Sequence, residues 1–394
     1  MKISGVRARA LTQPSADGDG RNEPQPHWIE GRIASPMSIF PEYSERRGDW
    51  AAFDDFIVEI EAENGEIGFA TSTGGQAAAL LVESNLARFV VGRDLSEGEM
   101  IWEHLWRSSL HWARKGVGVH AISAVDLALW DLRGKVDRAP VYELLGGSRL
   151  ELDMYATTPR ADAAKALGFS GVKLPLAFGP AQGEFGMKRN VQAIRQAREL
   201  VGDGFPIMLD CWMALDVPYT VALLDKVADC DVAWIEEPLP PDDYFGYAEL
   251  RRRLGGGVQV ACGEHEAGVQ GFDLLMRLGC CDVIQPDVRW CGGLTELLRI
   301  AALAEQYGVA LAPHCASVYG YHYLATRPPE PLAEFLLLEP GGADVVPILG
   351  PSFIGEPLPR DGRLMLGDAP GFGLGQAVDV HATTTTAAGG DDGS

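Results

Sequence analysis

The 394-residue sequence lacks several features that would place it in a specialised class of protein. No apolar run approaches the roughly 18 residues that a membrane helix needs, and the N-terminus has no apolar core followed by a cleavage site. Its seven cysteines are odd in number and show no C-x-x-C spacing, which indicates reduced thiols and argues against a disulfide framework. We therefore expect a cytoplasmic protein without a signal peptide.

Positive charge is also scarce. Lys and Arg number 33 against 55 Asp and Glu, so the formal net charge is −22. Such a chain repels phosphate backbones and anionic bilayers, and we expect neither nucleic acid nor a membrane as a partner. An anionic small-molecule substrate would need local cations, which a bound metal with a few Arg and His side chains could supply. The hydrophobic fraction of 46% is ordinary for a globular protein, and the length leaves room for two domains.

The first part of the chain predicts an α+β domain over residues 1–147. A strand over 2–11 precedes a Pro- and Gly-rich loop over 12–26 and an irregular stretch over 27–50, and such long irregular loops are often functional lids. Asn64-Gly65 is a strong hairpin signal between two strands. The strands are expected over 53–62 and 66–71, and helices over 76–90, 97–108, 121–134 and 140–147.

After Gly147 the pattern changes to strand, turn and helix, repeated. A (β/α)8 barrel allots roughly 30 residues to each unit, and the spacing here fits it. We expect an α/β fold, a (β/α)7β TIM-like barrel over 148–350, whose C-terminal segment over 351–394 returns to the first domain and ends in a low-complexity, disordered tail. The predicted strand ends are Tyr155, Lys173, Asp210, Glu236, Glu264, Asp287, His314 and Glu334.

Three short apolar runs, FPIMLDCW, VAWIEEPLPP and VQVACGEHE, each carry an acid where a buried parallel strand would end. The acids are Asp210, Glu236 and Glu264, spaced 26 and 28 residues apart. Any one of them alone is better explained as a cap on the following helix. Three in register on neighbouring strands would instead converge, and converging carboxylates form a site for a hard cation such as Mg²⁺.

His314 ends a further apolar strand, one unit beyond Asp287. An isolated histidine in this position is usually a core residue satisfied by a backbone carbonyl. Here Asp287 could hold the imidazole, fix its tautomer and raise its basicity. A proton-transfer pair beside a cation is the arrangement needed to abstract a weakly acidic proton.

The runs WIEEPLPP, GEHE, DVIQPDVRWCGGLTELLRIAALAEQYG and APH resemble the mandelate racemase and muconate lactonizing branch of the enolase superfamily. Within it, HWIEGRIASPMS, VDLALWDLRGKV, PVYELLGG and MLDCWMALDV resemble the L-rhamnonate dehydratases nearly end to end. The resemblance implies a hydro-lyase of carbohydrate catabolism that converts an acid sugar to a 2-keto-3-deoxy acid. L-Rhamnonate is the first candidate for this acid sugar. The resemblance also implies that Asp210, Glu236 and Glu264 bind Mg²⁺, and that His314 is the acid/base with Asp287 as its partner.

The resemblance assigns further roles. Glu334 would hydrogen-bond the enediolate oxygen as a protonated or shared-proton acid, although from the residues alone it is a solvated charge at a strand end. His27 and Arg47 map onto the loop that closes over the substrate, with Arg46 as a rival because the register is loose by one residue. His265 could donate to a substrate hydroxyl or be a polar turn residue.

Lys173 bears on the choice between related reactions. Many members of this branch carry Lys-x-Lys at this strand, whereas this chain has Lys173-Leu174-Pro175. Because proline cannot take a proton, two-base racemisation is disfavoured and a syn elimination by one base is favoured. The alternatives are an epimerase that uses Lys173, or a non-catalytic barrel protein. A zinc hydrolase is disfavoured because the sequence has no His-x-His.

The chain departs from the rhamnonate pattern in one motif, which reads GEHE where GEHH is expected, so L-lyxonate, L-mannonate or a related aldonate are alternative substrates. Glu266 and Leu176 could line the distal end of the substrate pocket. Homo-oligomers, often octamers, occur in this branch and are a weaker expectation here.

Overall fold

The structure is a computed structural model that describes residues 1–11, 28–30, 33–43, 54–315, 317–328, 332–350 and 352–377. The predicted lid residues His27, Arg46 and Arg47, and the predicted tail, lie outside these ranges. The described part of the predicted lid stretch contains the 3₁₀ turns Trp28–Glu30, Pro36–Ile39 and Pro41–Tyr43. No helix in the described ranges is long and apolar enough to cross a membrane.

The N-terminal part begins with a three-stranded antiparallel sheet in the order β1-β2-β3. Its strands are β1 (Ile3–Ala10), β2 (Asp55–Ala62) and β3 (Ile67–Thr73). The predicted hairpin is confirmed: Gly65 has a φ of 84°, and the Asn64 carboxamide oxygen accepts a hydrogen bond from the Glu66 N–H at 3.1 Å. These turn residues supply the positive φ and the local acceptor that a tight reversal needs.

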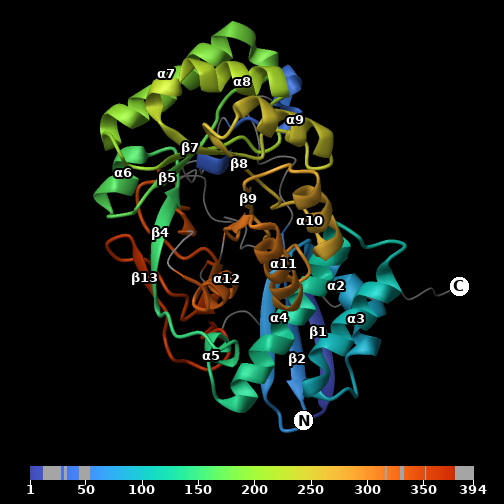
Figure 1. The fold of residues 1–394 in the computed structure, drawn as a ribbon. Helices are drawn as coiled ribbons and strands as arrows, with labels where there is room; N and C mark the ends of the chain where they lie inside the picture. The colour runs from blue at the N-terminus through green and yellow to red at the C-terminus, as the bar shows by residue number, and fades with distance from the viewer. Residues whose placement is uncertain are drawn as a thin grey trace, which may run out of the picture.

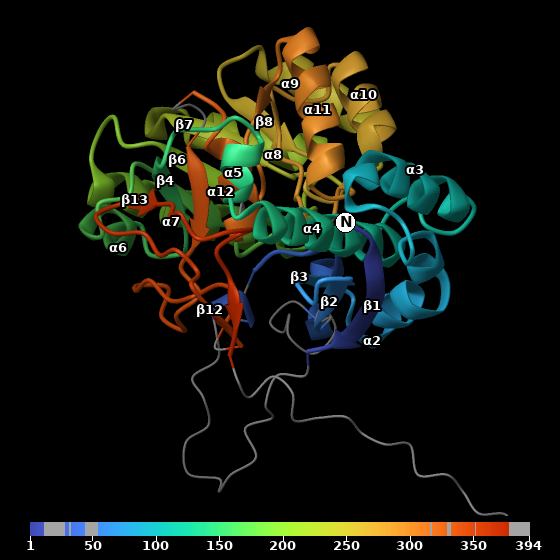
Figure 2. The same ribbon diagram turned by 90° about the horizontal axis from the view of Figure 1, so that it is seen from below.

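The helices that accompany this sheet are α2 (Gly75–Leu81), α3 (Gly98–Ser109), α4 (Val117–Asp137) and α5 (Val141–Leu144). Of these, α2 and α4 pack on its strands, while α3 and α5 pack on α4. Figures 1 and 2 show α4 running between the antiparallel sheet and the helices of the C-terminal part. The backbones pack so closely that a Cβ at Gly68 would lie 2.3 Å from the Leu132 nitrogen, so only glycine fits there.

The prediction of one continuous α-helix over 76–90 is wrong. It is α2 followed by a π-helical turn at Val82–Leu86 and a 3₁₀ turn at Ala87–Phe89. The Ser84 hydroxyl donates to the Leu80 carbonyl at 2.5 Å, and such back-bonding competes with the regular helix ladder.

The C-terminal part alternates strands and helices, and the parallel sheet runs β10-β9-β8-β7-β6-β5-β4-β11. Consecutive strands are joined by one helix each, which confirms the predicted (β/α)7β order. Figure 1 shows α6 to α11 on the outside of the curled sheet. The strands are β4 (Glu151–Thr157), β5 (Val172–Pro175), β6 (Ile207–Asp210), β7 (Val232–Glu236), β8 (Gln259–Cys262), β9 (Val283–Ile284), β10 (Ala310–Leu311) and β11 (Ala333–Leu336). The helices are α6 (Ala161–Ala166), α7 (Gly183–Val201), α8 (Val217–Lys226), α9 (Tyr244–Leu254), α10 (Gly268–Arg277), α11 (Leu294–Tyr307) and α12 (Ser317–Leu324).

The last described segment contacts both parts of the molecule. Its β12 (Phe353–Ile354) pairs with β14 (Gly375–Gln376), and its β13 (Arg363–Met365) pairs antiparallel with β4. Phe353 stacks on Phe69 of β3 with ring centroids 5.9 Å apart. The Asp131 carboxylate of α4 accepts from the N–H of Phe372 at 3.0 Å. This segment therefore ties the N-terminal sheet and α4 to the first strand of the parallel sheet.

Candidate active site

The predicted metal-binding acids lie at one edge of the parallel sheet. Asp210 and Glu236 are the last residues of β6 and β7 and face each other in the strand register. Glu264 follows the end of β8 by two residues. Glu236 and Glu264 are buried, with 0% and 3% of their surface exposed. Parallel strands bring their carboxyl ends to the same edge, so neighbouring tips carry these three acids together.

Burial and the neighbouring carboxylates change the pKa of Glu236. Burial raises its pKa, and the charges of Asp210, Glu334 and Glu264 raise it further, to about 8, against the opposing effect of Lys173. Burial likewise raises the pKa of Glu264. Carboxylates crowded in a desolvated site repel one another until a cation compensates them. The donor set consists of carboxylate oxygens, which suits a hard divalent cation.

Lys173 supplies an internal cation beside these acids. Its ammonium group forms ion pairs with Glu236 and, at 2.7 Å, with the Glu334 Oε1 atom, and it lies 3.9 Å from the Asp210 Oδ2 atom. Only 1% of this lysine is exposed. Its three donor positions therefore face three carboxylates contributed by β6, β7 and β11.

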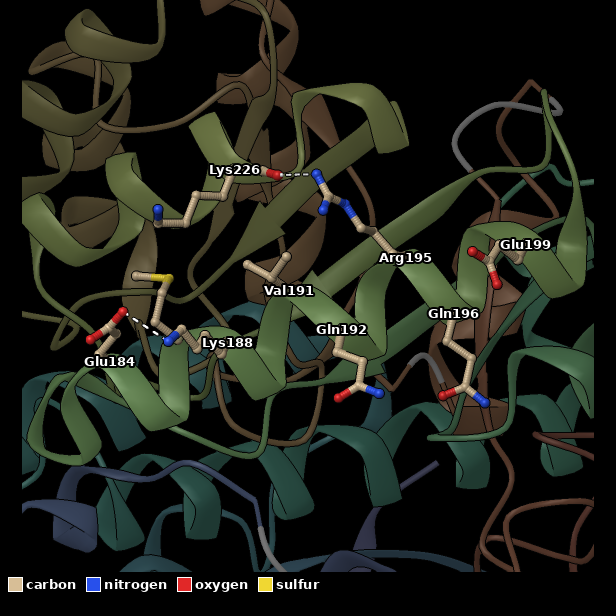
Figure 3. Close-up of a pocket in the computed structure, with 9 residues that line it drawn as sticks. Glu184, Lys188, Val191, Gln192, Arg195, Gln196, Glu199 and Lys226 are labelled. Atoms are coloured by element: carbon tan, nitrogen blue, oxygen red, sulfur yellow. Dashed lines mark hydrogen bonds and ion pairs between the residues drawn. The ribbon is translucent and has the colours of Figure 1, made fainter.

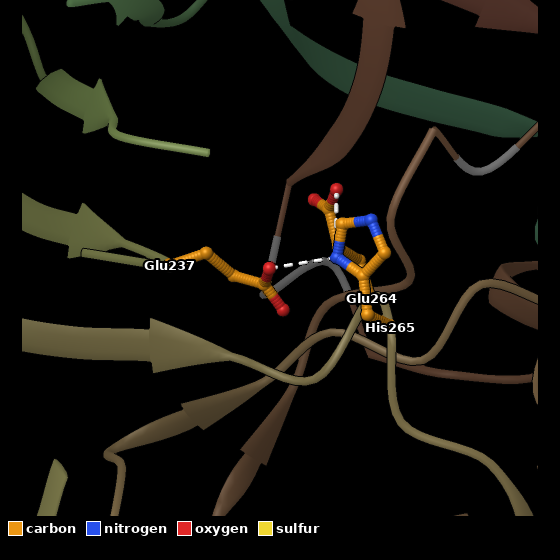
Figure 4. Close-up of side chains that lie close together, drawn as sticks. All are labelled: Glu237, Glu264 and His265. Carbon is orange, nitrogen blue, oxygen red and sulfur yellow. Dashed lines mark hydrogen bonds and ion pairs between the residues drawn. The ribbon is translucent and has the colours of Figure 1, made fainter. Parts of the chain in front are cut away.

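The oxygen atoms of the three predicted ligands are not gathered around a single point. Among the described residues, the His, Cys, Asp and Glu ligand atoms that all lie within 4.8 Å of one another belong to Glu237, Glu264 and His265 (Figure 4). Asp210 and Glu236 are drawn toward Lys173, whereas histidines flank Glu264. The predicted triad therefore shares a sheet edge, and its role as ligands stays a prediction.

His314 and Asp287 are brought together as the spacing predicts. The His314 Nδ1 atom lies 3.0 Å from Asp287 Oδ2, and its Nε2 atom lies 3.4 Å from Glu264 Oε2. Asp287 is itself held by the Arg289 N–H, which donates to its Oδ1 atom at 2.7 Å. Burial lowers the pKa of His314, but Glu264, Asp287 and Glu334 together raise it to about 10. With Nδ1 taken by Asp287, Nε2 is the ring atom that faces the acid cluster.

Glu334 on β11 is a buried hydrogen-bond acceptor. Its Oε1 atom accepts from the Thr157 hydroxyl at 2.5 Å and from Lys173, and its Oε2 atom accepts from the Cys315 N–H at 2.6 Å. Burial raises its pKa, but Lys173 and His314 lower the net value to about 2. In this arrangement it is an ionised acceptor, so the donor role expected for it would require that it first gains a proton.

His265 lies beside the metal-binding acids with its ring fixed on several sides. Its Nδ1 atom is 2.7 Å from Glu237 Oε2 and 3.5 Å from Glu264 Oε1. Its ring centroid lies 6.4 Å from that of Trp212 and 5.7 Å from that of Trp290. Trp290 also contacts the His314 ring, at 5.4 Å, so one indole lies against both histidines of the site.

The placement of Glu266 at the distal end of the substrate pocket stays a prediction. Its buried carboxylate accepts from the Tyr244 hydroxyl at 2.5 Å and from the Lys115 ammonium at 3.0 Å. It lines an outer hollow together with Trp112 and Gln270. The carboxylate is therefore engaged by a residue of the N-terminal part and is not presented to the sheet edge.

Several side chains that hold the site were not singled out from the sequence. Gln285 donates to Glu236 Oε2 at 2.7 Å, and Glu237 contacts His265. Glu237 could have been found because it directly follows a predicted ligand. No pattern in the sequence indicated Gln285 or Trp290, since their partners are distant along the chain.

A separate surface hollow lies on the outer helices. It is formed by α7 and the end of α8 and carries charged side chains of both signs (Figure 3). Glu184 and Lys188 pair across one turn of α7, and Arg195 donates to the Lys226 carbonyl. None of the predicted site residues lines it, so it is not the candidate active site.

Comparisons with known proteins agree with this architecture. Residues 54–146 match the family described as mandelate racemase / muconate lactonizing enzyme, N-terminal domain, and residues 157–379 match the enolase C-terminal domain-like family. A relative from Caldivirga maquilingensis, described as "Putative L-rhamnonate dehydratase", is 48% identical over 369 residues, which cover 93% of this chain and 92% of the relative.

Solved structures show the same fold over nearly the whole chain. A rhamnonate dehydratase from Gibberella zeae complexed with Mg is 42% identical, with a TM-score of 0.91 over 97% of this chain and 95% of that one. A racemase from Streptomyces coelicolor A3(2) with bound magnesium is 28% identical, with a TM-score of 0.75 over 95% of this chain and 97% of that one. The chain belongs to the mandelate racemase/muconate lactonizing enzyme family of the enolase superfamily.

Proposed function

We propose that this protein is a hydro-lyase that dehydrates an acid sugar, with L-rhamnonate as the first candidate, to a 2-keto-3-deoxy acid in the presence of Mg²⁺. The observation that carries the proposal is the His314–Asp287 pair, whose Nε2 atom faces Glu264 at 3.4 Å. The 48% identical relative and the Mg-complexed rhamnonate dehydratase structure support the substrate class and the cation.

Asp210, Glu236 and Glu264 are the residues proposed to hold Mg²⁺. They fit it because they offer carboxylate oxygens at adjacent strand ends, and because burial together with their mutual repulsion raises the pKa of Glu236. When bound, the cation supplies positive charge that stabilises the anion formed as a proton leaves the carbon next to a carboxylate. Gln285 orients Glu236 through its amide hydrogen bond.

His314 is proposed to act as both base and acid on one face of the sugar. In the neutral ring its Nε2 atom takes the proton from C2, while Asp287 holds the Nδ1–H and stabilises the resulting imidazolium. The imidazolium then gives this proton to the departing 3-hydroxyl, so that water leaves and an enol remains. The enol gains a solvent proton at C3 and becomes the keto acid. A single imidazole that performs both transfers gives syn elimination.

Other residues are proposed to orient the substrate. Glu334 would contact the oxygen on which charge develops, once it has gained a proton or shares one. His265 would hydrogen-bond a hydroxyl of the sugar. His27 and Arg47, with Arg46 as the rival at the second position, would close over the substrate.

An epimerase mechanism would need Lys173 as a second base. Its ammonium group is engaged by Glu236, Glu334 and Asp210, which leaves it unsuited to accept a proton from carbon. Incubation in D₂O separates the two reactions. Deuterium at C2 of recovered substrate without formation of keto acid would defeat dehydration.

The direct test is a screen of acid sugars with Mg²⁺, read by semicarbazide trapping of the keto acid. L-Rhamnonate, L-lyxonate and L-mannonate head the library. We expect product with one or more of them, and formation that is roughly 10³-fold slower with the His314→Asn variant. If no member of the library is turned over by the intact protein, the proposal is wrong.

Two further proposals concern the cellular compartment and the oligomeric state of the protein. The seven free cysteines support a reducing compartment, and we propose the cytoplasm. We also propose a homo-oligomer, with an octamer as one possibility, which light scattering after size-exclusion chromatography would measure.

A further inference from the structure

Glu237, next to a proposed metal ligand, has an unusual backbone and a buried carboxylate. Its φ is 39°, in the left-handed region that side-chain-bearing residues rarely adopt, and only 1% of its surface is exposed. The backbone is held on both sides, since its N–H donates to the Ala261 carbonyl at 3.0 Å and its carbonyl accepts from the Met213 N–H at 2.6 Å. Strained conformations of this kind persist where the surroundings enforce them, often at functional sites.

The two oxygens of the Glu237 carboxylate reach the turn that follows β8. Oε1 accepts from the Gly263 N–H at 3.2 Å, and Oε2 lies 2.7 Å from the His265 Nδ1 atom. These two partners flank Glu264 in the sequence. Figure 4 shows the carboxylates of Glu237 and Glu264 both reaching the same nitrogen of the His265 ring.

The turn itself leaves little freedom. Gly263 has a φ of 114°, and a Cβ there would lie 2.9 Å from the Phe272 ring. The His265 ring is also bounded by the indoles of Trp212 and Trp290. With Nδ1 engaged by Glu237, the remaining polar atom of this ring is Nε2. One carboxylate therefore determines which nitrogen of His265 is available.

We propose that Glu237 is a positioning residue, which fixes the orientation of His265 so that its Nε2 atom meets a hydroxyl of the substrate. The inference rests on the proposed function, in which His265 contacts the sugar. Carboxylates behind histidines orient the ring and fix its tautomer in many sites, and their loss often lowers activity by about 10–100-fold. In this account Glu237 acts on the substrate through His265 and is not itself a ligand of the cation.

Glu237→Gln is a sharp test because a carboxylate can accept both hydrogen bonds and an amide cannot. Either its NH₂ group faces the Gly263 N–H, or it faces the His265 Nδ1 atom, which can accept from it only if the ring adopts the other tautomer and so presents an altered Nε2 atom. We expect kcat/KM to fall by about 10–100-fold, mainly through KM. The exposed Glu249→Gln on α9 is the matched control and should leave kcat/KM unchanged.

A double-mutant cycle with His265→Asn tests whether Glu237 acts through the histidine. If it does, Glu237→Gln in the His265→Asn background lowers kcat/KM by less than about twofold. An equal loss in both backgrounds would overturn the proposal. Mg²⁺ affinity, measured by calorimetry, should be the same for Glu237→Gln and the parent protein. A large loss of affinity would instead make Glu237 a cation ligand and contradict the proposal.

A crystal structure of Glu237→Ala, which leaves the His265 Nδ1 atom without this partner, gives a result that does not depend on activity. We expect the His265 ring to be rotated while Asp210 and Glu236 keep their places, and an unmoved ring would contradict the proposal. If Glu237→Gln does not fold, Glu237→Asp, which is one methylene shorter, is analysed in the same way. The failure of the proposed function is a different result, namely that the intact protein turns over no acid sugar.

Discussion

At the scale of single residues, the positions of the acids and of His314 could be predicted from the sequence. Each ends a short apolar run at a regular spacing, and a parallel sheet places such ends together. The contacts of Lys173 could not be predicted, because Glu236 and Glu334 are 63 and 161 positions away in the sequence and meet it only in the fold. The same holds for the Gln285 contact to Glu236.

His314 is predicted to be indispensable for turnover. Removal of a general acid/base that makes both proton transfers should lower kcat by roughly 10³-fold, which we expect for His314→Asn in the keto-acid assay. The exposed His111→Asn is the control for the loss of a histidine elsewhere and should keep full activity. A loss of less than about tenfold would show that another group carries the proton.

Lys173 is predicted to stabilise the fold most when no cation is bound. Lys173→Met leaves the buried carboxylates of Glu236 and Glu334 without their counterion, and such a change lowers the free energy of unfolding by about 3–5 kcal/mol. Mg²⁺ should restore part of this loss, because it would supply positive charge at the same acids.

The measurement is chemical denaturation of Lys173→Met with Mg²⁺ and with EDTA. Lys188→Met, which removes an exposed lysine of α7, is the control and should change stability by less than about 0.5 kcal/mol. An equal loss in Mg²⁺ and in EDTA would contradict the link between Lys173 and the cation site.

At the scale of elements, hydrophobic periodicity placed β1 to β3, α3 and the alternating units of the barrel close to their observed bounds. Periodicity did not predict the π-helical turn at Val82–Leu86, because apolar spacing does not distinguish such a turn from a regular helix. The start of α4 at Val117, ahead of the expected 121, follows from Gly116, whose φ of 67° marks the break before the helix. A pattern of apolar residues does not report such backbone breaks.

The packing of α12 predicts a pH dependence of stability. His322 on α12 accepts a hydrogen bond from the Tyr142 N–H of α5 at 3.0 Å, and burial lowers its pKa to about 3. The fold therefore holds the neutral ring. Its contribution is complete above the ordinary pKa of 6.5 and is lost as the pH falls from there toward 3.

The test compares urea unfolding at pH 6.5 and pH 5. Over this range the intact protein should lose about 2 kcal/mol more than His322→Asn, whose amide oxygen can still accept from Tyr142 but does not titrate. Equal losses for the two proteins would mean that His322 does not carry this part of the pH dependence.

The contact between Lys115 and Glu266 is predicted to stabilise the docking of the N-terminal part on the barrel. Lys115 precedes α4, and Glu266 follows β8. Lys115→Met leaves a buried carboxylate with the Tyr244 hydroxyl as its remaining side-chain donor, and because the lysine is 38% exposed we expect a loss of about 1–2 kcal/mol. Arg253→Met, which breaks an exposed pair on α9, is the matched control. Equal effects of the two substitutions in thermal unfolding would show that this contact is no stronger than a surface pair.

At the scale of the whole molecule, we propose a division into a capping domain over 1–147, a barrel over 148–350 and a C-terminal segment over 351–394. The pairing of β13 with β4 and the stacking of Phe353 on Phe69 support a segment that contacts both domains. The order of the barrel followed from the sequence because each unit repeats one pattern. The return of the C-terminal segment to the first domain was expected without the resemblance, but its short strands have no periodicity of their own and were not predicted.

The central claim is that Asp210, Glu236 and Glu264 hold one divalent cation beside His314. Its most direct test is anomalous diffraction from a crystal soaked in Mn²⁺, which scatters strongly where Mg²⁺ does not. We predict a single strong peak coordinated by these three carboxylates, with the Nε2 atom of His314 facing the same space. A peak between Glu237, Glu264 and His265 that excludes Asp210 and Glu236, or no peak at the sheet edge, would contradict it.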